Sequence, residues 1–163
     1  MKTKNLILSA VFAAIICLAT MVIKIPLALG YVNLGDCFVL LSAFLLPMPY
    51  LLFPAAIGSC LADVFSGYAI YAPATFIIKG LMALSAYFIF KSLKRVKPLW
   101  AYLLSALIAE IIMVLGYFIF ETALYGFAAS IISVPFNALQ GFVGIITAVA
   151  SINIFKKIKF FNL

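Results

Sequence analysis

The sequence predicts an all-α integral membrane protein with six transmembrane helices. The second and third helices are expected to be short, and both termini are expected on the cytoplasmic side. Hydrophobic residues make up 68% of the 163 residues and charged residues only 9%, whereas soluble domains are about half apolar and a quarter charged. Such a chain cannot cover its surface with polar groups, so we expect one transmembrane domain over residues 1–163, in the cell membrane.

Four apolar segments are long enough to cross the bilayer core, which takes about 20 residues of helix. These segments are residues 6–24, 73–91, 99–120 and 131–155. The first follows Lys2 and Lys4 and in this respect is similar to a signal peptide. It is nevertheless long enough to span, and no small-residue cleavage site precedes a polar chain, so it is predicted to be the first helix.

The apolar stretch 37–64 is interrupted by Pro47, Pro49 and Pro54 and fits either one kinked helix or two short ones. With two helices there are six spans, and the clustered cations all fall on one side, as the positive-inside rule requires. With one helix, the basic loop and the C-terminal lysines would lie on opposite sides. We therefore predict two short helices. The clustered cations are Lys2, Lys4, Lys91, Lys94, Arg95, Lys97, Lys156, Lys157 and Lys159.

The net charge of +7 is explained by these anchors facing anionic lipid, so nucleic acid is not an expected partner. Trp100 follows the basic loop, where an interfacial aromatic anchor is expected. The chain has no histidine, which excludes the usual histidine metal sites and the Ser-His and Cys-His nucleophile pairs. We expect no cofactor, no metal site and no enzymatic activity.

With six spans, the polar residues that do not anchor a segment lie near the outer ends of the helices. Polar groups are costly in a membrane and normally face a cavity or one another. We therefore predict a ligand pocket open to the outside, in which Tyr31 and Phe136 join further tyrosines to suit a flat ring. The candidate binding residues are Asn33, Asp36, Asp63, Tyr68, Tyr71, Thr75, Lys79, Tyr117, Glu121, Asn137 and Gln140.

Several of these residues have a purely structural role as the alternative to ligand binding. Asp36 and Asp63 suit helix ends near the headgroups. Lys79 has Asp63 or Asp36 as a possible salt-bridge partner. Asn137 and Gln140 suit hydrogen bonds between helices.

Glu110 is the acid predicted in the middle of a helix, on one face with Tyr117 and Glu121. It needs a partner that the sequence does not identify. Glu110 and Lys79 together would also suit an autonomous ion-coupled carrier, which is an alternative function. The chain lacks the inverted repeat usual in such carriers.

Helix one carries small residues four apart, in the overlapping pairs Ser9–Ala13 and Ala10–Ala14. Small-xxx-small pairs let helices approach closely. This face is suited either to dock another membrane protein or to pack internally.

Four stretches of the chain resemble the substrate-binding S components of energy-coupling-factor (ECF) vitamin transporters. They are VNLGD, GSCLADVFSGYAIYAPATFIIKG, GYFIFE and FNALQGFVG. The resemblance implies six helices, cytoplasmic termini and a vitamin pocket near the outer surface. It also implies that Ala10 and Ala14 dock the membrane coupling (T) subunit and that two cytoplasmic ATPases supply the energy. No nucleotide motif is expected on this subunit, and the sequence has no GxxxxGK[ST] run.

The resemblance is to the branch that carries riboflavin, hydroxymethylpyrimidine and pyridoxine. We expect a hydroxymethylpyrimidine or pyridoxine-like ligand, with riboflavin as the alternative. Phosphorylated ligands are not expected, because no arginine and only one buried-side lysine, Lys79, are available. The loops over residues 30–36 and 67–73 are expected to close over the ligand, with the Asn33 amide above the pocket.

Overall fold

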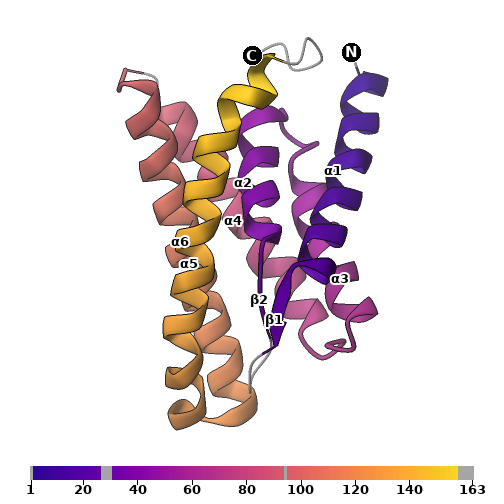
Figure 1. Cartoon of the computed structure of the whole chain (residues 1–163), viewed down its shortest axis with the longest axis vertical. Coiled ribbons are helices and arrows are strands. Elements are labelled where there is room, and N and C mark those ends of the chain that lie inside the picture. The colour runs from indigo at the N-terminus through magenta and orange to yellow at the C-terminus, as the bar shows by residue number, and fades with distance from the viewer. Residues whose placement is uncertain (1, 27–30, 94, 158–163) are drawn as a thin grey trace.

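The computed structural model describes residues 2–26, 31–93 and 95–157 and shows a bundle of helices (Figure 1). The third helix begins as a π-helical segment, η1, and continues directly into α3. The predicted number and order of helices are confirmed. The bounds are α1 (Lys2–Val22), α2 (Gly35–Leu45), η1 (Pro54–Gly58), α3 (Ser59–Phe65), α4 (Ala72–Ser92), α5 (Pro98–Tyr125) and α6 (Phe127–Lys157).

Helices α1, α4, α5 and α6 are long and apolar enough to cross a membrane, whereas α2 and the η1–α3 unit are shorter. The 11 residues of α2 rise only about 16 Å at 1.5 Å per residue, roughly half of the hydrocarbon core. The prolines explain why the helix is interrupted. The backbone becomes extended at Leu46, just before Pro47, and the next helical element begins at Pro54. The predicted short second and third helices are therefore confirmed.

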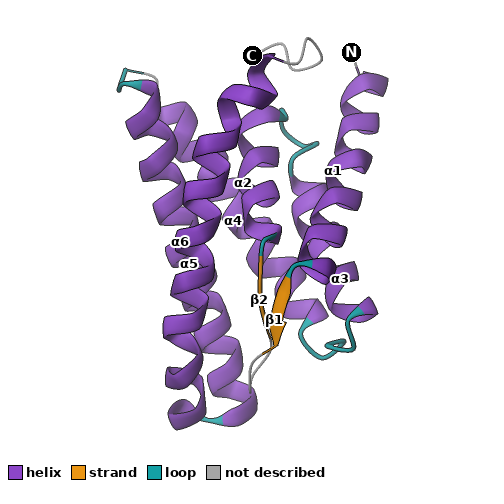
Figure 2. Ribbon diagram, viewed as in Figure 1, coloured by secondary structure: helices purple, strands orange, loops and turns teal. Residues whose placement is uncertain are grey.

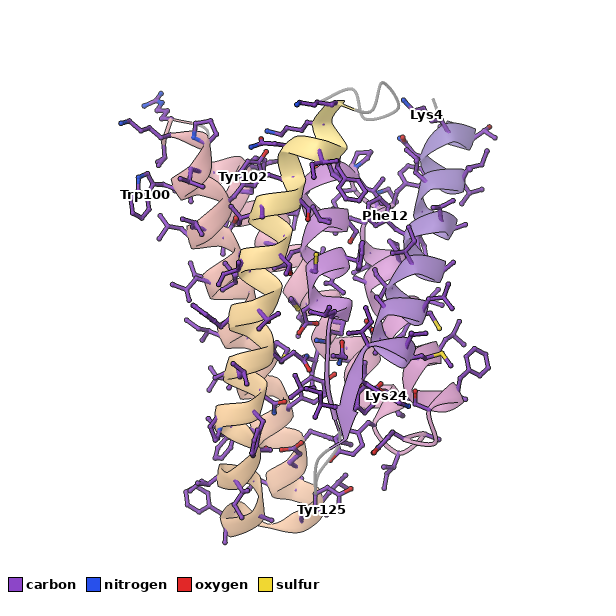
Figure 3. All side chains as sticks on the ribbon, viewed as in Figure 1. Lys4, Phe12, Lys24, Trp100, Tyr102 and Tyr125 are labelled. Atoms are coloured by element: carbon purple, nitrogen blue, oxygen red, sulfur yellow. The ribbon has the colours of Figure 1, made fainter. Side chains whose placement is uncertain are left out.

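Both termini lie at the same end of the bundle (Figure 1). Lys4 and Trp100 lie toward this end, and Lys24 and Tyr125 lie toward the opposite one (Figure 3). The positive-inside rule places the first end in the cytoplasm, and the exposed Trp100 ring there has the position expected of an interfacial anchor. Of the predicted cationic anchors, Lys94 and Lys159 lie outside the described residues.

A short β-hairpin follows α1, a feature that the sequence did not predict (Figure 2). Strand β1 (Lys24–Pro26) pairs antiparallel with β2 (Tyr31–Asn33), with Lys24 opposite Asn33 and Pro26 opposite Tyr31. Strands of three residues are too short to show a two-residue alternation. The hairpin brings β2 against α6 and so sets Asn33 and Tyr31 in the outer half of the bundle.

Helix α2 forms the centre of the bundle, where it contacts α1, α4 and α6. All of its residues except Phe38 are buried, including the polar Asp36 and Ser42. A helix that is apolar around its whole circumference is stable only when it is surrounded by other helices. The short α2 thus places its first turn, with Asp36, in the interior between three longer helices.

Helix α1 uses two of its small residues to pack internally. A Cβ atom at Gly58 would lie 2.7 Å from the carbonyl oxygen of Ala13, and Ser9 Oγ donates a 2.8 Å hydrogen bond to the Tyr50 carbonyl. Ala10 and Ala14 are exposed on the outer face of the helix. One small-residue pair is therefore used within the fold, and the other remains accessible.

The close approach at Gly58 predicts that Gly58→Ala lowers stability by about 1–3 kcal/mol, the usual effect of an extra methyl group in a packed interior. Thermal unfolding of the detergent-solubilised protein measures this effect. Gly80→Ala is the matched control, because a Cβ there has its nearest neighbour at 3.5 Å, in ordinary contact with Leu52. Equal unfolding temperatures for the two variants would contradict the close packing of α1 on η1.

Candidate ligand-binding site

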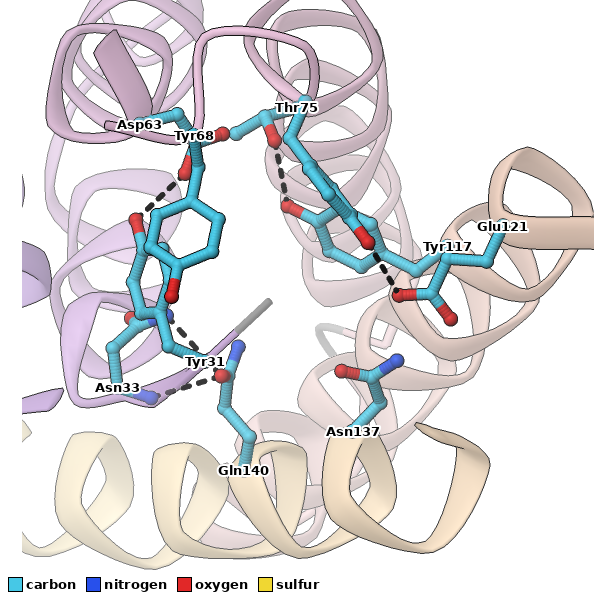
Figure 4. Close-up of a pocket in the computed structure, with 10 residues that line it drawn as sticks. Tyr31, Asn33, Asp63, Tyr68, Thr75, Tyr117, Glu121, Asn137 and Gln140 are labelled. Atoms are coloured by element: carbon cyan, nitrogen blue, oxygen red, sulfur yellow. Dashed lines mark hydrogen bonds between the residues drawn. The ribbon is translucent and has the colours of Figure 1, made fainter. Parts of the chain in front are cut away.

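The outer half of the bundle contains a pocket between β2, the α3–α4 region, α5 and α6 (Figure 4). The cavity volume between its side chains is about 30 Å³, and the free space is about 380 Å³ when the part open to the outside is included. Nine of its ten lining residues are among the predicted binding residues, and the tenth is Tyr31. The lining residues are Tyr31, Asn33, Asp63, Tyr68, Tyr71, Thr75, Tyr117, Glu121, Asn137 and Gln140.

Four tyrosines form the aromatic part of the pocket wall. The ring centroids of Tyr31 and Tyr68 are 4.9 Å apart, those of Tyr68 and Tyr71 are 6.3 Å apart, and those of Tyr71 and Tyr117 are 6.5 Å apart. Phe136, which we expected to join them, is exposed and does not line the pocket. One residue along α6 corresponds to a rotation of about 100°, so Asn137 takes the inward direction and Phe136 points away.

Asp63, near the end of α3, is held by a phenol from the hairpin. Tyr31 Oη donates to Asp63 Oδ1 over 2.6 Å. Burial raises the pKa of the Tyr31 phenol, and the neighbouring negative charge of Asp63 raises it further, so Tyr31 keeps the proton that it donates. The other oxygen, Oδ2, is buried and accepts no hydrogen bond within the described residues.

Asp36 and Lys79 form a buried salt bridge and do not line the pocket. Asp36 is 0% exposed and Lys79 is 3% exposed. Asp36 Oδ2 also accepts a 2.6 Å hydrogen bond from Gln140 Nε2. The Lys79 ammonium lies 5.5 Å from the centroid of the Tyr117 ring. Of the two partners proposed for Lys79, the structure selects Asp36, and the lysine charge is neutralised behind the wall of the pocket.

Gln140 connects this salt bridge to the hairpin. Its Oε1 accepts from the Asn33 backbone N–H at 2.9 Å and from Asn33 Nδ2 at 3.2 Å. Asn33 Oδ1 in turn accepts from the Gly35 N–H at 2.8 Å, where α2 begins. Asp36 lies in the first turn of α2 but binds Lys79 and Gln140, so the side chain that satisfies the start of the helix is Asn33.

Glu121, near the outer end of α5, is bound by hydroxyl groups on both carboxylate oxygens. Tyr71 Oη donates to Oε1 at 3.5 Å, and Ser133 Oγ donates to Oε2. Ser133 comes from α6 and was not among the predicted residues, because a single serine in an apolar helix carries no distinguishing signal. The carboxylate therefore joins α5 and α6 to the residue that precedes α4, in the wall of the pocket.

Glu110 of α5 lies outside this pocket and is 4% exposed. Neither of its carboxylate oxygens has a hydrogen-bond partner within the described residues. Its carboxylate lies against two glycines of α6: a Cβ at Gly141 would be 3.0 Å from Oε2, and one at Gly144 would be 3.0 Å from Oε1. The Gly144 position is also 3.0 Å from the Asp36 Cβ, so these glycines make room for two acidic side chains.

The fold and the pocket define a class of protein: a small multi-pass membrane protein with a polar, tyrosine-lined pocket near its outer face. Within that class, the chain belongs to the family described as ECF-type riboflavin transporter, S component, whose family model matches residues 1–157. It is a substrate-binding subunit of an ECF transporter in the cell membrane. The family is one of transporter components rather than of enzymes.

Proteins similar to this chain include a solved structure and a curated relative. A solved structure described as the S component of a bacterial ECF transporter has the same fold, with a TM-score of 0.71 and 22% identity over 98% of this chain and 99% of that chain. An uncharacterized protein in a gap 3'region of Pyrococcus woesei is 33% identical over 129 residues, 78% of this chain and 84% of the relative. The similarity to the solved structure shows that the two proteins share a fold.

The buried salt bridge predicts that Asp36→Ala destabilises the protein by about 3–5 kcal/mol, because it leaves the Lys79 charge without its partner in the interior. Thermal unfolding in detergent measures the loss. The double variant Asp36→Ala with Lys79→Ala is expected to recover part of it, since no unpaired ammonium remains. A single variant as stable as the unmodified chain would contradict the assignment of this pair.

Proposed function

We propose that this chain captures a small B-type vitamin or vitamin precursor, of the hydroxymethylpyrimidine or pyridoxine type, for import. The observation that carries the proposal is the outer pocket, whose wall combines four tyrosine rings with amide and carboxylate groups. Flat aromatic walls with a few placed polar groups are suited to a heteroaromatic ring with polar substituents.

The charges of the pocket support a ligand without phosphate. Among the described residues that line it there is no lysine or arginine, and Lys79 is already neutralised by Asp36. Phosphate recognition normally uses one or more such cations. Riboflavin is the alternative ligand, favoured by the description of the family.

In the proposed binding mode, the ring lies among the tyrosines and its polar edges bind the amides and carboxylates. Gln140 is held between Asn33 and Asp36, so it presents its amide in a preset orientation. The turn that carries Tyr68 and Tyr71, together with the hairpin, would close over the ligand. Gly30, at one end of the expected closing loop, lies outside the described residues.

The direct test is mass spectrometry of small molecules that co-purify with the protein. Calorimetric titration of the ligand-stripped protein with hydroxymethylpyrimidine, pyridoxine and riboflavin would follow. We expect one of these to bind at a stoichiometry of one. Asn33→Ala should weaken that ligand about tenfold, because Gln140 loses the side-chain donor that orients it. Absence of binding by every vitamin and precursor tried would refute the proposal.

Transport requires partners, which we propose to be the membrane coupling subunit and two cytoplasmic ATPases. The exposed pair Ala10 and Ala14 supports docking of the coupling subunit, because small residues on an accessible helix face allow close approach of a second helix. The ATPases would then act through the coupling subunit.

Ala14→Trp is expected to leave ligand binding unchanged while reducing co-purification of the coupling subunit and ATP-dependent uptake by at least about tenfold, because the indole blocks close helix approach. Leu104→Trp on the exposed face of α5 is the control and should preserve both. Uptake by proteoliposomes that contain this chain alone would instead favour an autonomous ion-coupled carrier.

A further inference from the structure

The pocket is lined by two carboxyl groups and, among the described residues, by no lysine or arginine. The carboxyl groups belong to Asp63 and Glu121, and Lys79, behind the wall, is paired with Asp36. Lys24 of the hairpin lies 5.5 Å from the Tyr31 ring centroid but is not a lining residue. A ligand that enters this space therefore meets carboxylate groups without a facing cation among the described lining residues.

The two carboxylates differ in their hydrogen bonding. Both oxygens of Glu121 accept from hydroxyl groups, those of Tyr71 and Ser133. Asp63 accepts a hydrogen bond only at Oδ1. Its Oδ2 is buried beside the neighbouring Thr75 side chain and accepts no hydrogen bond from the described residues. Leaving a buried carboxylate oxygen without a donor is costly, so Asp63 Oδ2 is the acceptor in the wall that most needs a ligand donor.

A second unpartnered group comes from α6. Asn137 Nδ2 is buried and donates no hydrogen bond to any described residue. In Figure 4 the Asn137 side chain points from α6 into the space, and Asp63 lies beyond that space beside Tyr31 and Tyr68. The pocket thus offers one free acceptor and one free donor from different sides of its wall.

We infer that the ligand presents an N–H group to Asp63 Oδ2 and an acceptor atom to Asn137 Nδ2, so that this pocket selects amino-substituted or ring-protonated heteroaromatic compounds. The inference rests on the proposed function and specifies its substrate class. Asp63 is then the specificity-determining residue. The short bond from Tyr31 keeps its carboxylate oriented. A methoxy group in place of the amino group would set an acceptor oxygen against the carboxylate, with no proton between the two.

The experiment compares matched ligand pairs by calorimetry on the full-length, ligand-stripped protein. The first pair is 4-amino-5-hydroxymethyl-2-methylpyrimidine and its 4-methoxy analogue, which carries no N–H group. The second is pyridoxine and its analogue with the ring nitrogen replaced by C–H. We expect the N–H-bearing member of at least one pair to bind about tenfold more tightly or better. If both members of every pair that binds do so equally, or if only riboflavin binds and Asp63→Asn leaves its affinity unchanged, the inference is overturned.

Asp63→Asn, which removes the charge but keeps the shape, is expected to reduce this preference to within about twofold. Glu121→Gln is the matched control, because it makes the same change at a carboxylate whose oxygens are already occupied. It should change the affinity for both members of a pair alike and leave their ratio intact. Retention of the full preference in Asp63→Asn, or its loss only in Glu121→Gln, would contradict the role of Asp63.

Two measurements separate a failed variant from a failed inference. Thermal unfolding shows whether Asp63→Asn is folded, and the comparison of ligand pairs on the unmodified protein does not depend on any variant. Asn137→Leu removes the free donor and should weaken the preferred ligand about tenfold. The outcome in which no vitamin or precursor binds the unmodified protein refutes the proposed function itself, whereas equal binding within pairs refutes only the selectivity.

Discussion

The buried ion pair between Lys79 and Asp36 is the interaction on which the outer half of this protein depends. It joins α4 to the first turn of α2, and Gln140 extends it to α6 through Asp36 Oδ2. A buried ion pair is weak evidence for stability, because desolvating two charges offsets much of their attraction. The ion pair instead fixes how the helices are placed. The hydrocarbon core offers neither charge another partner, so α2, α4 and α6 have one arrangement in which both charges are paired.

From this pair the hydrogen bonds run outward to the pocket. Gln140 binds Asn33, and Asn33 binds the backbone at the start of α2, so the β-hairpin is attached to the same network as the salt bridge. The side chains under the pocket are thereby held before a ligand arrives. Preorganisation of this kind lowers the entropy that binding must otherwise overcome. It also explains why two charged groups expected in the pocket are found behind its wall.

Helix number, helix lengths and the end that carries the termini could be predicted from the sequence, because they depend on apolar length, prolines and the distribution of cations. The polar residues of the outer half could also be predicted to converge. Their pairing could not, because Asp36 and Asp63 are both acids at helix ends, and only the packing of α2 against α4 decides which one meets Lys79. The hairpin could not be predicted from the sequence for a related reason. Its three-residue strands are defined by their pairing with each other and not by a periodic pattern.

The polar side chains around the pocket therefore fall into two groups with different physical roles. Asp36, Lys79, Gln140 and Asn33 satisfy one another and form the support. Asp63 and Asn137 each keep one buried atom without a partner among the described residues. In a membrane protein such atoms are expensive unless something satisfies them when the protein acts. Their position on separate helices around one space is the basis of the proposed ligand chemistry: an acceptor bound by Tyr31 on one side, a donor from α6 on the other, and aromatic rings between them.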